Sequence, residues 1–144
     1  MKLDIADNEN KGKTFHYEID DEKSKMLRGK KIGDEIDGHV LDSKFKGFKF
    51  KITGLSNIAG FPALEKIEGI GLKKLLLTKK DKGMSGKRSK KHKKIKGLRL
   101  KKTLRGNTIA KDIVQVNLKV IEGKGLANIL KKPASEEVNP EEKK

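Results

Sequence analysis

The chain has 144 residues, of which 33% are apolar and 39% charged, and its 36 basic and 20 acidic side chains give a formal net charge of +16. It has no cysteine, which excludes disulfides, thiolate metal sites and cysteine nucleophiles. No stretch approaches the roughly 18 consecutive apolar residues of a membrane span, and acids stand where a signal peptide needs an apolar run. We therefore expect a soluble protein of the cytoplasm, with one modest core.

Alternating apolar residues open the chain. Leu3 and Ile5 alternate with polar neighbours, turn residues follow at 8–12, and a second alternation runs over 15–19. A period of two residues places side chains on alternate faces of a strand. The sequence therefore predicts an N-terminal β-hairpin.

A short helix is predicted next. Acids at 20–22 precede bases and then Gly29, an order that complements the helix dipole and ends at a favourable stop residue. Met26 and Leu27 are its expected buried contacts, and turns are expected around 33–38.

The clearest strand contains Phe48, Phe50 and Ile52, which alternate with lysines. A loop with glycines and a proline is expected over 54–62, and a short apolar strand over 74–78.

The C-terminal part contains a β-branched run at 113–121, which predicts another strand, and a last helical turn at 125–130. Residues 131–144 have the composition of a flexible charged tail. Together these elements predict a mostly β fold: one small β-barrel domain over 1–130, with a short helix and a long basic extended loop.

All of the net positive charge lies between Lys73 and Lys111. This basic segment has 17 Lys and Arg against one acid, Asp81, whereas residues 1–72 and 112–144 are each neutral. A dense segment of one sign repels itself unless a polyanion neutralises it, and the release of counterions then favours binding. The basic segment is therefore predicted to bind nucleic acid.

Residues 79–106 show neither a strand nor a helix period, which predicts a loop that is functional or disordered in the free protein. The basic segment has no aromatic side chain, whereas readers of single strands usually interleave bases and stacking residues. We expect it to recognise phosphates and RNA shape more than base identity. The candidate RNA-binding residues are Lys73, Lys74, Lys79, Lys80, Lys82, Lys87, Arg88, Lys90, Lys91, His92, Lys93, Lys94, Lys96, Arg99, Lys101, Lys102, Arg105 and Asn107.

A second hypothesis concerns residues 46–50, which partly match the stacking strand of RNA-recognition and cold-shock domains. Lysines stand where that pattern has a small residue and a valine. In this alternative, the protein is a sequence-nonspecific RNA chaperone, or another basic nucleic-acid-binding protein, that stacks bases on Phe48 and Phe50. Phenylalanines on one face of a strand are more often part of a core.

Catalytic and metal sites are not expected. Asp34, Glu35, Asp37 and Asp42 are close in sequence, but no nucleophile, base or oxyanion donor accompanies them. The three histidines lack ligand spacing. We expect no enzymatic activity, cofactor, metal or small-molecule substrate.

Several blocks, in order along the chain, carry a resemblance to one known family. They are residues 1–5, 18–22, 29–38, 48–54, 60–62 and 102–120. The chain resembles the archaeal and eukaryotic small-subunit ribosomal protein six, which is unrelated to the bacterial protein of the same number. It departs from the family pattern over 55–74. It is most similar to archaeal members, because it lacks the long basic C-terminal helix of eukaryotic ones.

The resemblance implies a β-barrel body with an extended basic segment that binds small-subunit ribosomal RNA. It also implies neighbouring ribosomal proteins as partners and a place in the ribosome. The block 105–109 and the strand after it distinguish this family from chromatin proteins and RNA chaperones.

Overall fold

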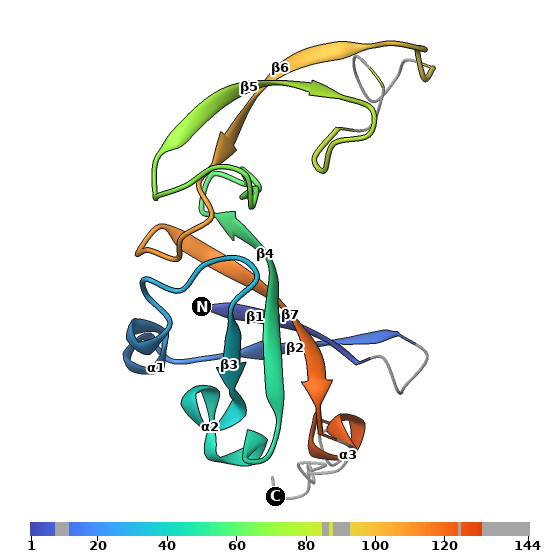
Figure 1. The fold of residues 1–144 in the computed structure, drawn as a ribbon. Helices are drawn as coiled ribbons and strands as arrows, with labels where there is room; N and C mark the ends of the chain where they lie inside the picture. Colours follow the sequence, from blue (N-terminus) through green and yellow to red (C-terminus); the bar gives the residue numbers. More distant parts are fainter. Residues whose placement is uncertain (8–11, 85–86, 88–92, 124, 131–144) are drawn as a thin grey trace, which may run out of the picture.

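A computed structural model of the chain describes residues 1–7, 12–84, 87, 93–123 and 125–130. The fold is mostly β, with a five-stranded sheet and a separate two-stranded ribbon that arches above it (Figure 1). The elements are β1 (Lys2–Asp7), β2 (Lys13–Glu18), α1 (Asp21–Met26), β3 (Glu35–Asp37), α2 (Gly38–Leu41), the 3-10 helix η1 (Ser43–Phe45), β4 (Lys49–Asn57), β5 (Leu72–Thr78), β6 (Arg99–Arg105), β7 (Ile113–Glu122) and α3 (Leu126–Leu130). The predicted tail at 131–144 lies outside the described residues.

The five-stranded sheet, which we call the body together with its helices, joins the two ends of the chain. β1 and β2 pair antiparallel, which confirms the predicted hairpin. β1 also pairs parallel with β7, so that Leu3 lies beside Val116 and Ile5 beside Leu118. The strand predicted at 113–121 is therefore the centre of the sheet, between β1 and β4.

The sheet order is β2-β1-β7-β4-β3. In the described part of the chain, β2 and β3 are its two edges, and neither sheet closes on itself. The mostly β class is confirmed, but the predicted barrel is not. In the described residues no helix is long and apolar enough to cross a membrane.

A bulge in β4 corrects the predicted start of the loop at residue 54. The register against β7 shifts between Ile52 and Gly54, which inserts Thr53 as an extra residue. Phe50 and Ile52 point into the core before the bulge, and Leu55 returns to it afterwards. The strand therefore continues to Asn57 instead of ending at Gly54.

Aromatic side chains organise the core of the body. Phe45 and Phe50 are fully buried, with ring centroids 5.7 Å apart at an interplanar angle of 90°. Leu27 is buried as predicted, whereas Met26 is 66% exposed. The prediction for Met26 was wrong because α1 is only six residues long, and its buried side is Ser24 together with the following Leu27.

The ribbon corrects the largest loop prediction. β5 contains the strand predicted at 74–78, and it pairs antiparallel with β6 along its whole length, from Leu72 beside Arg105 to Thr78 beside Arg99. Residues 99–105 are therefore a strand, not the end of a 28-residue loop. We call residues 72–105 the arm.

A seam of backbone hydrogen bonds joins the arm to the body. The amide of Gly106 donates to the carbonyl of Gly71 at 3.0 Å, and that of Asn107 donates to Ile67 at 2.8 Å. On the other side of the seam, the amide of Ile32 donates to Asn107 at 3.0 Å. Residues 105–109 thus connect the loop before β5, which contains Ile67 and Gly71, to the loop before β3, which contains Ile32.

Gly106 is expected to be essential for this seam. A Cβ at Gly106 would lie 1.9 Å from the carbonyl oxygen of Gly69, which is backbone and has no rotamer to change. We expect Gly106→Ala to destabilise the protein by roughly 1–3 kcal/mol. Gly71→Ala is the matched control, because nothing lies within 4 Å of its Cβ position, and thermal unfolding of both variants is the measurement. Equal melting temperatures for the two variants would contradict the packing described here.

Candidate nucleic-acid interface

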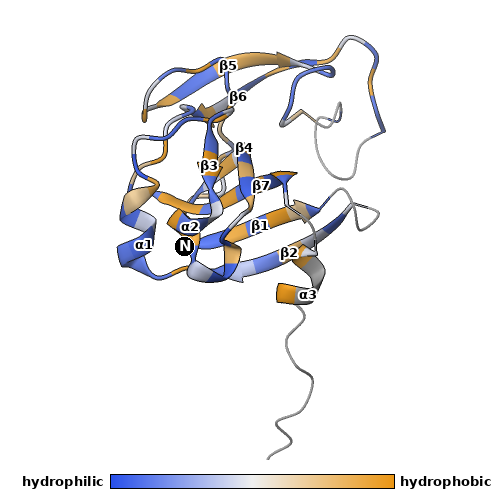
Figure 2. Cartoon of the chain, turned by 60° about the horizontal axis from the view of Figure 1, so that its bottom comes forward, coloured by the Kyte–Doolittle hydropathy of each residue, from blue (hydrophilic) through white to orange (hydrophobic). Residues whose placement is uncertain are grey.

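The arm has two different faces, because side chains alternate along each strand. Apolar and polar residues both occur along β5 and β6 (Figure 2). On the inner face, Leu77 and Leu104 are 3% and 1% exposed, and they pack with Met84 and Ile67 in a small second core. The loop after β5 folds back beneath this face, where the Lys102 ammonium donates to the Gly83 carbonyl at 3.2 Å. The basic segment therefore buries some apolar surface of its own, contrary to the loop interpretation.

Asp81, the one acid of the basic segment, has a structural role. Its Oδ2 accepts hydrogen bonds from the backbone amide and the hydroxyl of Thr78, each at 2.8 Å. These bonds hold the pKa of the Asp81 carboxyl below its usual value. Asp81 thus fixes the turn that ends β5, and it does not form an ion pair with an arm lysine in the described residues.

Most candidate residues that the structure describes lie on the surface of the arm and its loop. Ten of them are exposed: Lys73, Lys74, Lys79, Lys80, Lys82, Lys93, Lys94, Lys96, Arg99 and Lys101. In the part of the chain that the structure describes, none of these ten forms an ion pair. Lys87 and Lys102 are half-buried. Arg88, Lys90, Lys91 and His92 lie outside the described residues.

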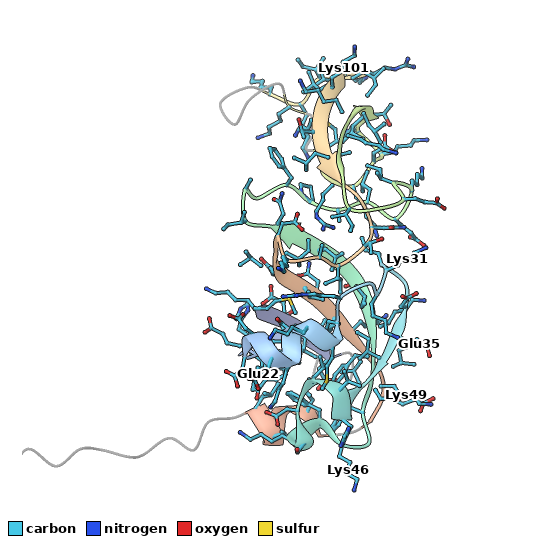
Figure 3. All side chains as sticks on the ribbon, turned by 90° about the vertical axis from the view of Figure 1, so that its left-hand side faces the viewer. Glu22, Lys31, Glu35, Lys46, Lys49 and Lys101 are labelled. Carbon is cyan, nitrogen blue, oxygen red and sulfur yellow. The ribbon has the colours of Figure 1, made fainter. Side chains whose placement is uncertain are left out.

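Some cations of the body, in contrast, are paired with acids on its surface. Lys2 pairs with Glu18 at 3.6 Å, and Lys49 pairs with Glu122 at 2.8 Å. The Glu122 carboxylate raises the pKa of Lys49 above its usual value. The arm carries its charges away from these pairs, as the positions of Lys101 and Lys49 show (Figure 3).

Two candidate residues are inside the protein. Arg105 is 0% exposed, and its Nε and Nη2 donate to the two carboxylate oxygens of Asp112, each at 2.7 Å. Its Nη1 donates to the carbonyls of Gly106, at 3.1 Å, and Thr108. Each of its three side-chain nitrogens thus donates to a group of the protein, and the side chain is fully buried, so Arg105 does not present its guanidinium to a polyanion.

Asn107 is the second internal candidate, at 6% exposed. Its Nδ2 donates to the backbone carbonyl of Glu65 at 3.1 Å, and its Oδ1 accepts from the hydroxyl of Thr108. It stabilises the seam at the base of the arm. Residues 105–109, the block that distinguishes the family, therefore connect the arm to the body and do not form part of the exposed surface.

The alternative stacking platform is contradicted. Phe48 and Phe50 are 6% and 0% exposed, and their rings stack on each other with centroids 6.0 Å apart. A base cannot reach either ring face, so the core interpretation of residues 46–50 is correct.

One cation belongs with the arm although it lies outside the basic segment in sequence. Lys66 is exposed and lines a hollow of about 200 Å³ together with Lys80 and Lys82 at the base of the arm. Its charge contributes to the lowered pKa of Asp81. No pattern around residue 66 signals this neighbourhood, because only the fold-back of the loop after β5 creates it.

The described residues bring no three His, Asp or Glu side chains together as metal ligands. The described residues thus form a β body with balanced charge and a projecting basic ribbon. The model of one family, ribosomal protein S6e, matches residues 1–131. The chain belongs to that family.

Curated relatives agree with this assignment. The small ribosomal subunit protein eS6 of Methanosphaera stadtmanae is 42% identical over 126 residues, which are 86% of this chain and 89% of that protein. The eS6 of Methanococcus maripaludis is 41% identical over 122 residues, 85% and 87% of the two chains. That of Thermoplasma acidophilum is 42% identical over 111 residues, 77% and 81%. The resemblance drawn from the sequence is confirmed, and so is the expected place in the cytoplasm, with the ribosome.

Proposed function

We propose that this chain is a structural protein of the small ribosomal subunit that binds ribosomal RNA with its arm. One observation carries the proposal: ten exposed cations lie on one projecting element whose one acid is Asp81, above a body whose positive and negative charges balance. Without a polyanion, these cations repel one another, whereas phosphates neutralise them and release counterions.

The arm suits a backbone-binding role. Two paired strands of seven residues span roughly 20 Å and hold the Cα atoms of their cations at fixed spacing, so less backbone entropy is lost on binding than for a free loop. Because Arg105 and Asn107 are internal, they belong to the support of this surface and not to the surface itself. Lys66 extends the surface at the base of the arm.

Salt titration of RNA binding is the test. We expect the affinity of the full chain for archaeal small-subunit ribosomal RNA to fall with salt, with a slope of log affinity against log salt on the order of −5 or steeper. In the variant Lys74→Gln, Arg99→Gln and Lys101→Gln, three phosphate contacts are lost, and the slope should become shallower by roughly 2–3.

The variant Lys13→Gln, Lys25→Gln and Lys46→Gln is the matched control. It removes the same charge from three exposed cations of the body, which should leave the slope close to that of the wild-type chain. A wild-type slope near −1, or equal slopes for the two triple variants, would contradict binding through the arm.

A further inference from the structure

The outer face of the arm is not uniformly basic. By the register of the ribbon, this face carries the side chains of Leu72, Lys74, Leu76 and Thr78 on β5 and of Arg99, Lys101 and Thr103 on β6, and at its base the buried Arg105 beside Leu72. Leu72 is 53% and Leu76 54% exposed, whereas on the inner face Leu77 is 3% and Leu75 36% exposed. Two leucines are thus exposed to solvent among cations. Binding of phosphates to these cations does not by itself require exposed leucines.

The size and charge of this face limit what can cover it. A stable protein interface buries on the order of 1,000 Å² or more, and two half-exposed leucines supply only a small part of that. Lys74, Arg99 and Lys101 surround them, and the only acid on the arm, Asp81, is engaged by Thr78. The face therefore needs a partner with many negative charges and with small apolar surfaces between them.

The backbone of an RNA duplex has this composition, since its phosphates alternate with riboses whose C–H groups are apolar. In A-form RNA the major groove is deep and narrow, and side chains do not read it, whereas the minor groove is wide and shallow and displays the 2′-hydroxyls. Because this groove is shallow, side chains as short as leucine and threonine reach its floor, and the longer lysine and arginine side chains extend to the phosphates at its rims.

We propose that the outer face of the arm lies in the minor groove of a ribosomal RNA duplex. In this arrangement Leu72 and Leu76 pack on riboses, the Thr103 hydroxyl faces a 2′-hydroxyl, and Lys74, Arg99 and Lys101 bind the flanking phosphates. The proposal rests on the proposed function, and it adds which face of the arm binds and which feature of the RNA it recognises.

Apolar and ionic contacts respond differently to salt, and this difference provides the test. Leu72→Ser with Leu76→Ser should weaken binding of the full chain to small-subunit ribosomal RNA by about 10-fold at every salt concentration, with an unchanged salt slope. Ile58→Ser with Ile121→Ser is the matched control, because both side chains are exposed on the body, 81% and 45%, and this pair should leave affinity unchanged.

Hydroxyl-radical cleavage of the bound RNA gives a second readout. We expect the wild-type chain to protect riboses on both strands of one duplex across its minor groove, and the leucine variant to lose that protection first. A DNA duplex of the same sequence should show no difference between the wild-type chain and the leucine variant.

Two results would overturn the proposal. If the leucine variant binds free ribosomal RNA like the wild type but fails to enter small subunits, the leucines contact a protein neighbour. If the leucine variant both binds RNA and assembles normally, the outer face contacts neither RNA nor a protein neighbour. In either case the proposed function stands as long as the variant Lys74→Gln, Arg99→Gln and Lys101→Gln makes the salt slope shallower. If this variant leaves the slope unchanged, the proposed function is wrong, whatever the leucine variant shows.

Discussion

Replacement of residues 72–104 by a four-residue Gly-Ser linker should yield a folded body that no longer binds ribosomal RNA. The replacement removes 15 cations and one acid, so the net charge falls from +16 to +2. Affinity for small-subunit ribosomal RNA at physiological salt should fall by roughly 100-fold or more, since the phosphate contacts of the arm are lost together.

The geometry at the base of the arm permits this replacement. Leu72 and Arg105 are paired neighbours, and the amide of Gly106 donates to the carbonyl of Gly71, so a short linker closes the gap. The core of the body contains residues between Leu3 and Ala63 and between Ile109 and Leu126, and none from the arm. Ile67 loses its cover and should be changed to Thr in the same variant.

Circular dichroism and thermal unfolding would report the fold, and filter binding the affinity. A folded variant that binds like the wild-type chain would show that the arm is not the RNA-binding element. An unfolded variant would show that the second core of Ile67, Leu77, Met84 and Leu104 is needed for the first, which the separate clusters argue against.

The body strands were predictable because one of their faces is buried in a large core. Alternation of polar and apolar residues marks β1 and β4, and a β-branched run marks β7. The structure places all three strands where they were predicted, although β4 continues beyond Gly54. α2 and η1 were not predicted. They pack closely because Gly38 has no side chain: a Cβ on Gly38 would lie 2.1 Å from the Phe45 carbonyl oxygen. Such a contact leaves no periodic trace in the sequence.

β6 was missed for a different reason. Its inner face reads Leu100, Lys102, Leu104, and the small core beneath it needs only the two leucines. The lysine between them is tolerated because its ammonium reaches the Gly83 carbonyl at the edge. A ribbon with a core this small does not produce the alternation that predicts a strand.

The candidate site was predictable as a charge pattern but not as a surface. Charge counting cannot distinguish Arg99, which is exposed, from Arg105, which is buried beside an acid seven residues later. It also cannot find Lys66 or the two exposed leucines of the outer face, because both depend on how β5, β6 and their loop fold together.

The buried Arg105 should therefore matter for stability and not for RNA contact. Arg105→Met removes a two-bond pair with Asp112 and leaves the Gly106 and Thr108 carbonyls without their donor. We expect the free energy of unfolding to fall by roughly 2–4 kcal/mol. This is at the lower side of what breaking a buried pair costs, because the Asp112 side chain is 40% exposed and regains water. The melting temperature should fall on the order of 10 °C.

The pH dependence of this loss follows from Asp112. The hydrogen bond from Arg105 holds the pKa of the Asp112 carboxyl below its usual value in the folded protein. A lowered folded-state pKa stabilises the protein above the unfolded pKa of about 3.9, and this contribution disappears as the pH falls through the folded-state pKa. The difference in unfolding free energy between wild type and Arg105→Met should therefore be constant near neutral pH and shrink below about pH 4.

Arg99→Met is the matched control, since it removes the same group from an exposed position on the same strand. It should leave the melting temperature nearly unchanged and make the salt slope of RNA binding shallower by about 0.9. Arg105→Met, measured well below its melting temperature, should keep the wild-type slope. If the two variants exchange these behaviours, Arg105 is a phosphate contact, and its burial against Asp112 does not describe the free protein.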